Sequence, residues 1–200
     1  MITLLDCGVS NVASVERALH RLGAESQCAT TPECVSTAHA LLLPGVGHFE
    51  ALIRVLDERK LRAPLIDTIR RGIPFLGICL GLQALYDTSE EAPELTGLQL
   101  LPGRVRALPP VAKLPHMGWN RLVTKHKSQL LQGVEADAYF YFAHTYAAME
   151  PGEETVAACS YGTEFVAVLE KEKMCAVQFH PEKSGKAGAQ VLRNFLRLCA

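Results

Sequence analysis

A short apolar run that ends in a cysteine between two glycines constrains this chain most. Residues 73–83 read Ile-Pro-Phe-Leu-Gly-Ile-Cys-Leu-Gly-Leu-Gln, which predicts a strand over 73–78, a sharp turn at Cys79 and a helix start. Gly77 and Gly81 lie where a Cβ would collide with a tight turn. A helix N-terminus behind Cys79 would favour the thiolate, the reactive form. A buried cysteine that packs as a small apolar side chain would fit the same residues.

The residues near the C-terminus favour a catalytic role for this cysteine. Residues 175–184 read Cys-Ala-Val-Gln-Phe-His-Pro-Glu-Lys-Ser, an apolar strand that runs into a His-Pro-Glu sequence. In an extended chain His180 and Glu182 point to the same side, and Pro181 keeps His180 out of the helical region. A cysteine nucleophile needs a base, and the base needs an acceptor that orients it. Cys79, His180 and Glu182 are therefore a candidate triad, although a histidine at a strand end can also simply bond a neighbouring carbonyl group.

Two further segments belong to the same pattern. Residues 40–47 read Ala-Leu-Leu-Leu-Pro-Gly-Val-Gly, an apolar strand and a turn whose backbone N–H groups, with that of Leu80, can hold an oxyanion. Taken alone, the turn is a strand-to-loop connection or a weak phosphate loop, and no Gly-Lys-Ser/Thr follows it. Residues 115–120, Pro-His-Met-Gly-Trp-Asn, contain the only tryptophan and predict an ordered loop. Trp119 can belong to the core, to a substrate wall or to a partner contact.

The rest of the chain alternates strands and helices. We predict strands over 2–5, 25–29, 40–43 and 73–78 and helices over 12–22, 49–59, 62–71 and 185–198. Uninterrupted apolar strands of this kind predict a mostly parallel sheet covered by helices on both faces. From about residue 97 to 182 the pattern predicts an inserted, largely antiparallel layer, with strands at 104–108, 119–124, 138–143, 154–159, 165–169 and 174–179. We therefore expect an α/β fold in a single domain over residues 1–200.

Composition limits the partners and the location. A formal net charge of −1 does not favour nucleic acid or an acidic membrane surface. The seven cysteines contain no Cys-x-x-Cys, so neither a disulfide framework nor a zinc site is predicted. The first residues already form a strand, and no apolar run approaches a membrane span, so we expect a cytoplasmic protein.

Taken together, these motifs resemble a known family. Gly-Ile-Cys-Leu-Gly-Leu-Gln at 77–83 and Phe-His-Pro-Glu at 179–182 resemble the class I, triad-type glutamine amidotransferases. The resemblance covers essentially the whole chain. Within this family, the segments that most resemble the glutaminase subunits of imidazole glycerol phosphate synthase are residues 44–47, 114–120, 141–146 and 180–184. One loop departs from the family pattern: at 7–11 it reads Cys-Gly-Val-Ser-Asn, where we expect a tyrosine or similar residue first and a glycine before the asparagine. Its conformation stays open, and Cys7 is a possible stray thiol near the site.

The resemblance implies a fold and a mechanism. The fold would be the flavodoxin-like class I amidotransferase fold with a small additional antiparallel strand layer. Cys79 would attack the side-chain amide of glutamine, with His180 as base and Glu182 orienting the imidazole, and neither a metal nor an organic cofactor is needed. The oxyanion would be held by backbone groups of Val46 and Leu80, and the substrate by Gly45, Gln83, Glu91, Thr145 and Tyr146. Without the resemblance, Gln83 is equally a first-turn helix residue and Glu91 a solvated loop acid.

The resemblance also implies a partner. Ammonia released here would pass to a separate cyclase, a (β/α)8 barrel that needs about 250 residues of its own. That heterodimer would make imidazole glycerol phosphate and aminoimidazole carboxamide ribonucleotide in histidine biosynthesis. Our candidates for the interface or the ammonia gate are Asn11, Trp119, Tyr141 and Lys183, each of which can equally be a surface or loop-anchoring residue.

Three other functions stay open at this point. The first is the glutaminase of another amidotransferase, serving pyridoxal phosphate, anthranilate or GMP synthesis. The second is an autonomous cysteine γ-glutamyl hydrolase, which would be active without a partner. The third is a non-catalytic binding module on the same fold, which an intact triad argues against.

Overall fold

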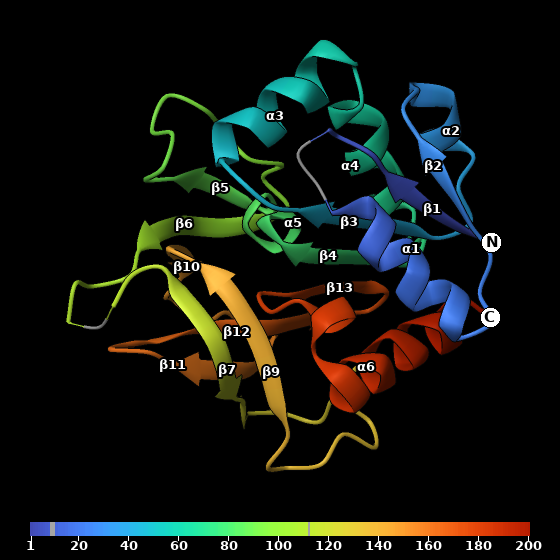
Figure 1. The fold of residues 1–200 in the computed structure, drawn as a ribbon. Helices are drawn as coiled ribbons and strands as arrows, with labels where there is room; N and C mark the ends of the chain where they lie inside the picture. The colour runs from blue at the N-terminus through green and yellow to red at the C-terminus, as the bar shows by residue number, and fades with distance from the viewer. Residues whose placement is uncertain (9–10, 112) are drawn as a thin grey trace.

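A sheet of eight strands forms the centre of the molecule (Figure 1). The computed structural model describes residues 1–8, 11–111 and 113–200. The strands of this sheet are β1 (Ile2–Leu5), β2 (Ser26–Ala29), β3 (Leu41–Gly45), β4 (Phe75–Cys79), β8 (Val123–Thr124), β11 (Thr155–Ser160), β12 (Glu164–Lys171) and β13 (Met174–Val177). Their order is β2-β1-β3-β4-β13-β12-β11-β8. The pairs from β2 to β13 are parallel and those from β13 to β8 antiparallel, which confirms a mostly parallel sheet.

Helices cover both faces of this sheet, as predicted (Figure 1). Because neighbouring residues of a strand point to opposite faces, β3 contributes to two separate cores. Leu42 packs in the core that contains Val15 and Phe195, whereas Leu41 packs in the core that contains Leu52. The first core lies under α1 (Val12–Arg21) and α6 (Gly185–Leu198), and the second lies under α2 (Pro32–Ser36), α3 (Phe49–Glu58) and α4 (Arg62–Arg70). Among the described residues, none of the helices combines the length and the apolar run that crossing a membrane requires.

The strands predicted for one inserted layer are divided among three sheets. β8, β11 and β12 extend the central sheet, because residues such as Val156 to Cys159 are buried in succession and need cover on both faces. A three-stranded sheet contains β5 (Tyr86–Ser89), β6 (Leu101–Ala107) and β10 (Tyr146–Ala148), and a two-stranded ribbon contains β7 (His116–Arg121) and β9 (Tyr139–His144).

The prediction of a loop at 115–120 is wrong, because β7 occupies residues His116–Arg121. Gly118 has a φ of +138° and weakens the strand signal. The strand forms because it pairs with β9 along its whole length, Trp119 opposite Tyr141. Only tertiary pairing provides that stabilisation, so the local sequence does not reveal it.

Parallel register brings the predicted site segments to one edge of the sheet. Gly45 pairs with Cys79 across β3 and β4, and Val177 pairs with Ile78 across β13 and β4. The carboxyl ends of these three strands therefore lie together, where open α/β sheets bind their ligands. The Pro-Gly turn, the cysteine and the segment that leads to His180 all follow from these ends.

Candidate active site

Cys79 lies in a strained turn between β4 and the four-residue helix α5 (Leu80–Gln83). Its φ is +55° and its ψ −105°, a conformation that costs a non-glycine residue about 1–3 kcal/mol. A Cβ on Gly77 would lie 2.6 Å from the carbonyl oxygen of Gly81, and one on Gly81 would collide with the carbonyl oxygen of Leu43. The predicted sharp turn and its need for both glycines are confirmed.

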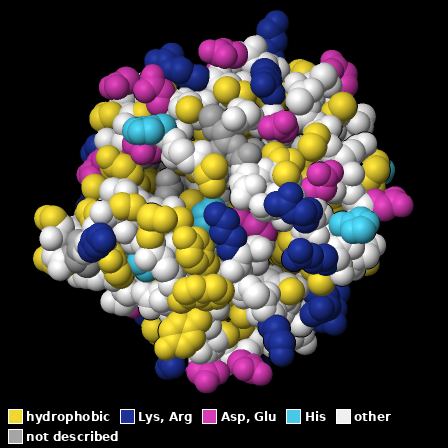
Figure 2. Space-filling view, viewed as in Figure 1, with side chains coloured by type: hydrophobic (Ala, Val, Ile, Leu, Met, Phe, Trp, Pro, Cys, Tyr) yellow, Lys and Arg dark blue, Asp and Glu magenta, His cyan; other side chains and the backbone are white. Residues whose placement is uncertain are grey.

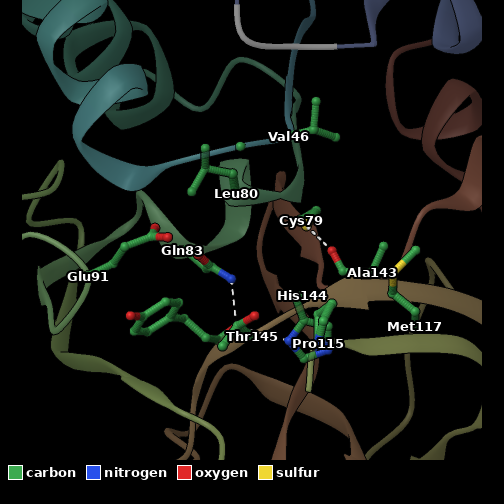
Figure 3. A pocket seen from close by; sticks show the side chains of 12 residues that line it. Val46, Cys79, Leu80, Gln83, Glu91, Pro115, Met117, Ala143, His144 and Thr145 are labelled. Atoms are coloured by element: carbon green, nitrogen blue, oxygen red, sulfur yellow. Dashed lines mark hydrogen bonds between the residues drawn. The ribbon is translucent and has the colours of Figure 1, made fainter. Parts of the chain in front are cut away.

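The Cys79 sulfur makes two hydrogen-bond contacts among the described residues. Its Sγ lies 4.0 Å from the Ala143 carbonyl oxygen, drawn as a dashed line in Figure 3, and 3.5 Å from Nε2 of Gln178. The side chain is 5% exposed. The nucleophile candidate is therefore almost enclosed and reaches solvent only through the adjacent cavity.

His180 and Glu182 form a buried pair beside this cysteine. His180 Nδ1 donates to Glu182 Oε1 at 2.9 Å, and the two side chains are 2% and 1% exposed. Burial by itself would lower the pKa of His180, but the negative charge of Cys79 and the hydrogen bond and charge of Glu182 outweigh it and raise the pKa to about 10. Nε2 of His180 makes no hydrogen bond to any part of the chain that the structure describes. It is thus available to exchange a proton with the thiol or with a substrate.

The local geometry of the His-Pro-Glu segment differs from the extended one predicted. His180 is extended, with φ −100° and ψ 96°, as Pro181 requires, but Pro181–Lys183 form the 3-10 turn η1. The Glu182 carboxylate reaches the His180 ring because of this turn, and not because alternate residues of a strand point to the same side. Ser184, for which the sequence suggested no separate role, donates to the His180 carbonyl at 2.6 Å and accepts from the Tyr141 N–H at 3.0 Å. It thereby ties the His180 backbone to β9.

A cavity of about 180 Å³ opens beside Cys79 (Figure 3). Seven of the predicted site residues line it, namely Val46, Cys79, Leu80, Gln83, Glu91, Thr145 and Tyr146. Gly45 is not one of the lining residues; a Cβ there would lie 2.7 Å from the Leu80 Cβ, so its lack of a side chain lets β3 approach the elbow. Met117, Ala143 and His144 of the β7–β9 ribbon, with Pro115 just before β7, complete one wall.

Gln83 and Glu91 both make specific contacts. Glu91 Oε2 accepts from the N–H of Phe49, the first residue of α3, at 2.7 Å, and its side chain is 11% exposed. Gln83 Nε2 donates to the Tyr146 carbonyl at 2.7 Å. Figure 3 shows Gln83 between the Glu91 carboxylate on one side of the pocket and Cys79 on the other. Glu91 is therefore not the solvated loop acid that its local sequence would equally allow. Gln83 does lie in the first turn of α5, but it is buried and bonded at the cavity.

Two buried histidines, His116 and His144, are joined by a hydrogen bond of fixed direction, and His144 also lines the cavity. His144 Nδ1 lies 2.9 Å from the Tyr146 carbonyl, which can only accept, so His144 Nε2 accepts from Nδ1 of His116 at 3.1 Å. Burial lowers the pKa of His116 to about 4 and that of His144 to about 3. Both rings are therefore neutral at pH 7. The sequence pattern gave no sign of this pair, because the two residues meet only when β7 pairs with β9.

This pair predicts a loss of stability in mild acid. Below about pH 6.5 the unfolded chain protonates both histidines, whereas the folded protein does so only near pH 4 and 3. The free energy of unfolding is expected to fall as the pH is lowered from 7 to 5, as measured by urea unfolding. His116→Gln should reduce this pH dependence, and His39→Gln, which changes an exposed histidine, should not. Equal stability of the wild type at both pH values would contradict the prediction.

Three of the four proposed interface residues, Trp119, Tyr141 and Lys183, lie together next to His180 of the candidate triad. Trp119 is 55% exposed and contacts the Tyr141 ring edge-on at 5.9 Å, and Lys183 Nζ lies 5.6 Å from the centre of that ring. Tyr141 in turn lies 6.5 Å from the His180 ring. Figure 2 shows apolar side chains gathered over the ribbon on this face, where Met117, Trp119 and Tyr139 are exposed.

The first loop is only partly described. Asn11 is the N-terminal flanking residue of α1. Val9 and Ser10 lie outside the described residues, so the conformation of this loop stays open. Cys7 is buried at 1% exposure, and burial raises the pKa of its thiol to about 11. It does not line the cavity, and at pH 7 it is a protonated thiol.

Comparisons with known proteins agree on the family. The family model "Glutamine amidotransferase class-I" matches residues 3–199. A Methanothermobacter thermautotrophicus protein named imidazole glycerol phosphate synthase subunit HisH is 47% identical over 198 residues, 99% of this chain and 98% of that protein. A protein of the same name from Moorella thermoacetica is 42% identical over 97% of this chain and 93% of its own length.

Solved structures share the fold at low sequence identity. A structure titled "Crystal structure of glutamine amidotransferase" has a TM-score of 0.78 at 20% identity and covers 99% of this chain and 98% of its own. The structure of PurLQS from Thermotoga maritima has a TM-score of 0.76 at 16% identity and covers 98% of this chain and 97% of its own.

Proposed function

Because the chain belongs to the class-I glutamine amidotransferase family, we propose that it is the glutaminase subunit of an imidazole glycerol phosphate synthase in histidine biosynthesis. The proposal rests first on the near-complete match to relatives that bear this subunit's name, at 47% and 42% identity. The geometry that supports it best is a cysteine in a strained elbow, at the end of a cavity and beside a buried His–Glu pair. We further propose that residues 1–200 act as one domain. A cytoplasmic location stays a prediction.

In the proposed reaction the Cys79 thiolate attacks the side-chain carbonyl carbon of glutamine. The backbone N–H groups of Leu80 and Val46, both of which line the cavity, would hold the oxyanion that forms. His180 then gives its proton to the departing nitrogen, and ammonia leaves while the acyl group stays on sulfur as a thioester. Water, deprotonated by the same histidine, attacks the thioester and releases glutamate and the thiol.

The pocket walls suit the rest of the substrate. Glu91 presents a carboxylate beside the cavity, where it can accept from the α-ammonium group of glutamine. Thr145 and Tyr146 provide backbone groups on the opposite wall, and Gln83 is held between them and the elbow. We propose these four residues as the substrate-binding set, with Gly45 acting through the close approach of β3 to α5.

We propose that the β7–β9 ribbon docks the cyclase subunit. Its exposed apolar side chains lie next to the residues that would release ammonia, with Tyr141 between Trp119 and His180. Pro115, Met117 and Ala143 belong to the ribbon region and also line the cavity. A partner seated on this face would cover the mouth of the pocket, which is what the sheltered transfer of ammonia needs. Asn11 and Lys183 would lie at the edge of the same contact.

The test is the release of glutamate from glutamine by the purified chain, alone and with the cyclase subunit and its nucleotide ligand. We expect little activity alone and a rise of roughly tenfold or more in the complex, the scale of a typical coupling between sites. Trp119→Ala should reduce this rise, and Val111→Ala, which alters an exposed apolar residue outside the ribbon, should leave it unchanged. Strong activity of the chain alone, unaffected by the cyclase, would instead identify an autonomous hydrolase or the glutaminase of another synthase.

A further inference from the structure

A buried glutamine that belongs to no part of the proposed triad contacts the nucleophile. Gln178 follows the last residue of β13 and is 0% exposed, and its Nε2 lies 3.5 Å from Cys79 Sγ. The parallel pairing of Val177 with Ile78 puts Gln178 beside Cys79 at the ends of adjacent strands. The sheet register, and not a flexible loop, therefore sets this contact.

The direction in which the Gln178 amide faces is fixed by neighbours that can bond in only one way. The Tyr146 carbonyl can only accept, so Gln83 must present its amide nitrogen to it, at 2.7 Å. The same nitrogen donates its second hydrogen to Gln178 Oε1 at 3.2 Å. Gln178 therefore turns its own nitrogen, which can only donate, toward the sulfur.

The two groups that hydrogen-bond the sulfur, the Ala143 carbonyl and the Gln178 amide, favour opposite protonation states. The Ala143 carbonyl, 4.0 Å from Sγ, can only accept and so favours the S–H form. The Gln178 N–H can only donate and so favours the thiolate, because hydrogen bonds to an ionised acceptor are roughly twice as strong as those to a neutral one. The thiolate is the nucleophilic form of cysteine. His180 also faces the sulfur, and its positive charge favours the thiolate. Loss of the Gln178 donor therefore removes one of the two groups that oppose the Ala143 acceptor.

We propose that Gln178 is a positioning residue for Cys79, which holds the sulfur by an N–H···S hydrogen bond and stabilises its thiolate, and that Gln83 fixes the direction of this donor. The expected effect of Gln178 on glutamine turnover rests on the proposed glutaminase function. The expected effect on the reactivity of the Cys79 thiol does not, because it depends only on the contact between Gln178 and Cys79.

The test is the pH dependence of alkylation of Cys79 by iodoacetamide in Gln178→Met, which keeps the side-chain length and removes the donor. The other cysteines also carry free thiols, so the rate is followed on the peptide that contains Cys79 by mass spectrometry. We expect the pH of half-maximal rate to rise by about one unit, hence an about tenfold slower reaction below that pH. Glutamine turnover in the complex should show a fall in kcat with little change in KM, because Gln178 does not line the cavity.

Two further variants make the result decisive. Gln83→Met frees the Gln178 amide to turn and should shift the alkylation profile in the same direction by less. Asn194→Leu removes another buried amide, which bonds the carbonyls of Leu130 and Gln132 far from the site, and should leave the profile unchanged. An unshifted profile in Gln178→Met, or an equal shift in Asn194→Leu, would overturn the proposal. If the profile shifts as expected but no form of the protein hydrolyses glutamine, the positioning role stands and the proposed function fails.

Discussion

Replacing Cys79 with alanine is expected to abolish glutamine-dependent synthesis by the complex while synthesis from added ammonium salt continues. Without the sulfur no thioester can form, and removal of a nucleophile that acts together with its base lowers kcat by about four orders of magnitude or more. The fold should persist, because Cys79 is a small side chain in a turn that Gly77 and Gly81 already shape. Alanine also tolerates the positive φ no worse than cysteine does. The measurement is the rate of product formation by the complex with glutamine and, separately, with ammonium chloride.

A second cysteine provides the control for this experiment. Cys175 in β13 is 0% exposed, and burial raises the pKa of its thiol well above the usual range, so it is a packing residue. Cys175→Ala removes the same sulfur atom from a buried site and should leave both the glutamine and the ammonium reactions near their wild-type rates. Loss of the ammonium reaction in Cys79→Ala would mean that the substitution damages folding or docking and would leave no support for a nucleophilic role.

Replacing Glu182 with glutamine is expected to lower kcat by about 10³- to 10⁴-fold, the scale seen when a triad loses the carboxylate that orients its histidine. Glutamine has nearly the same shape but no charge, so the imidazolium of His180 loses the partner that helps to raise its pKa to about 10. Fewer molecules then hold the imidazolium and thiolate together. KM should change little, because Glu182 does not line the cavity.

The comparison for this variant is another carboxylate of similar structural importance. Glu170 accepts hydrogen bonds from Ser128, Gln129 and Leu130 and lies away from the pocket. Glu170→Gln should affect thermal stability and leave kcat unchanged. Retention of more than about a tenth of wild-type kcat by Glu182→Gln, far above what loss of a triad carboxylate leaves, would show that Glu182 only supports the local fold.

The elbow and the contact between His180 and Glu182 could be predicted because their determinants are local. The turn at Cys79 requires a glycine on each side for steric reasons, and both glycines lie within the five consecutive residues 77–81. His180 and Glu182 are two residues apart, so they stay close whether the segment is extended or forms the 3-10 turn that it does. The mostly parallel sheet followed from the apolar strands for a similar reason.

The polar network behind the site could not be predicted, because it depends on segments that are distant in sequence. Gln178 reaches Cys79 across 99 residues and Gln83 reaches Tyr146 across 63. The neutral pair of His116 and His144 exists only because β7 and β9 are in register. The sequence does contain one sign of such contacts: Gln178 is a polar residue at the end of an otherwise apolar strand. That signal shows that a buried partner is needed but not which residue provides it.

The alternation of buried and half-buried residues along β9 makes this strand intolerant of insertions. Tyr141 and Ala143 are half-buried on the ribbon side, whereas Phe140, Phe142 and His144 are buried on the other. Since the period is two, a single inserted residue would exchange these two sets and carry Phe142 to the surface and Tyr141 into the core. We therefore expect a change of length to disrupt folding within β9 and to be tolerated better at residues 135–137, which are exposed in the connection that precedes the strand.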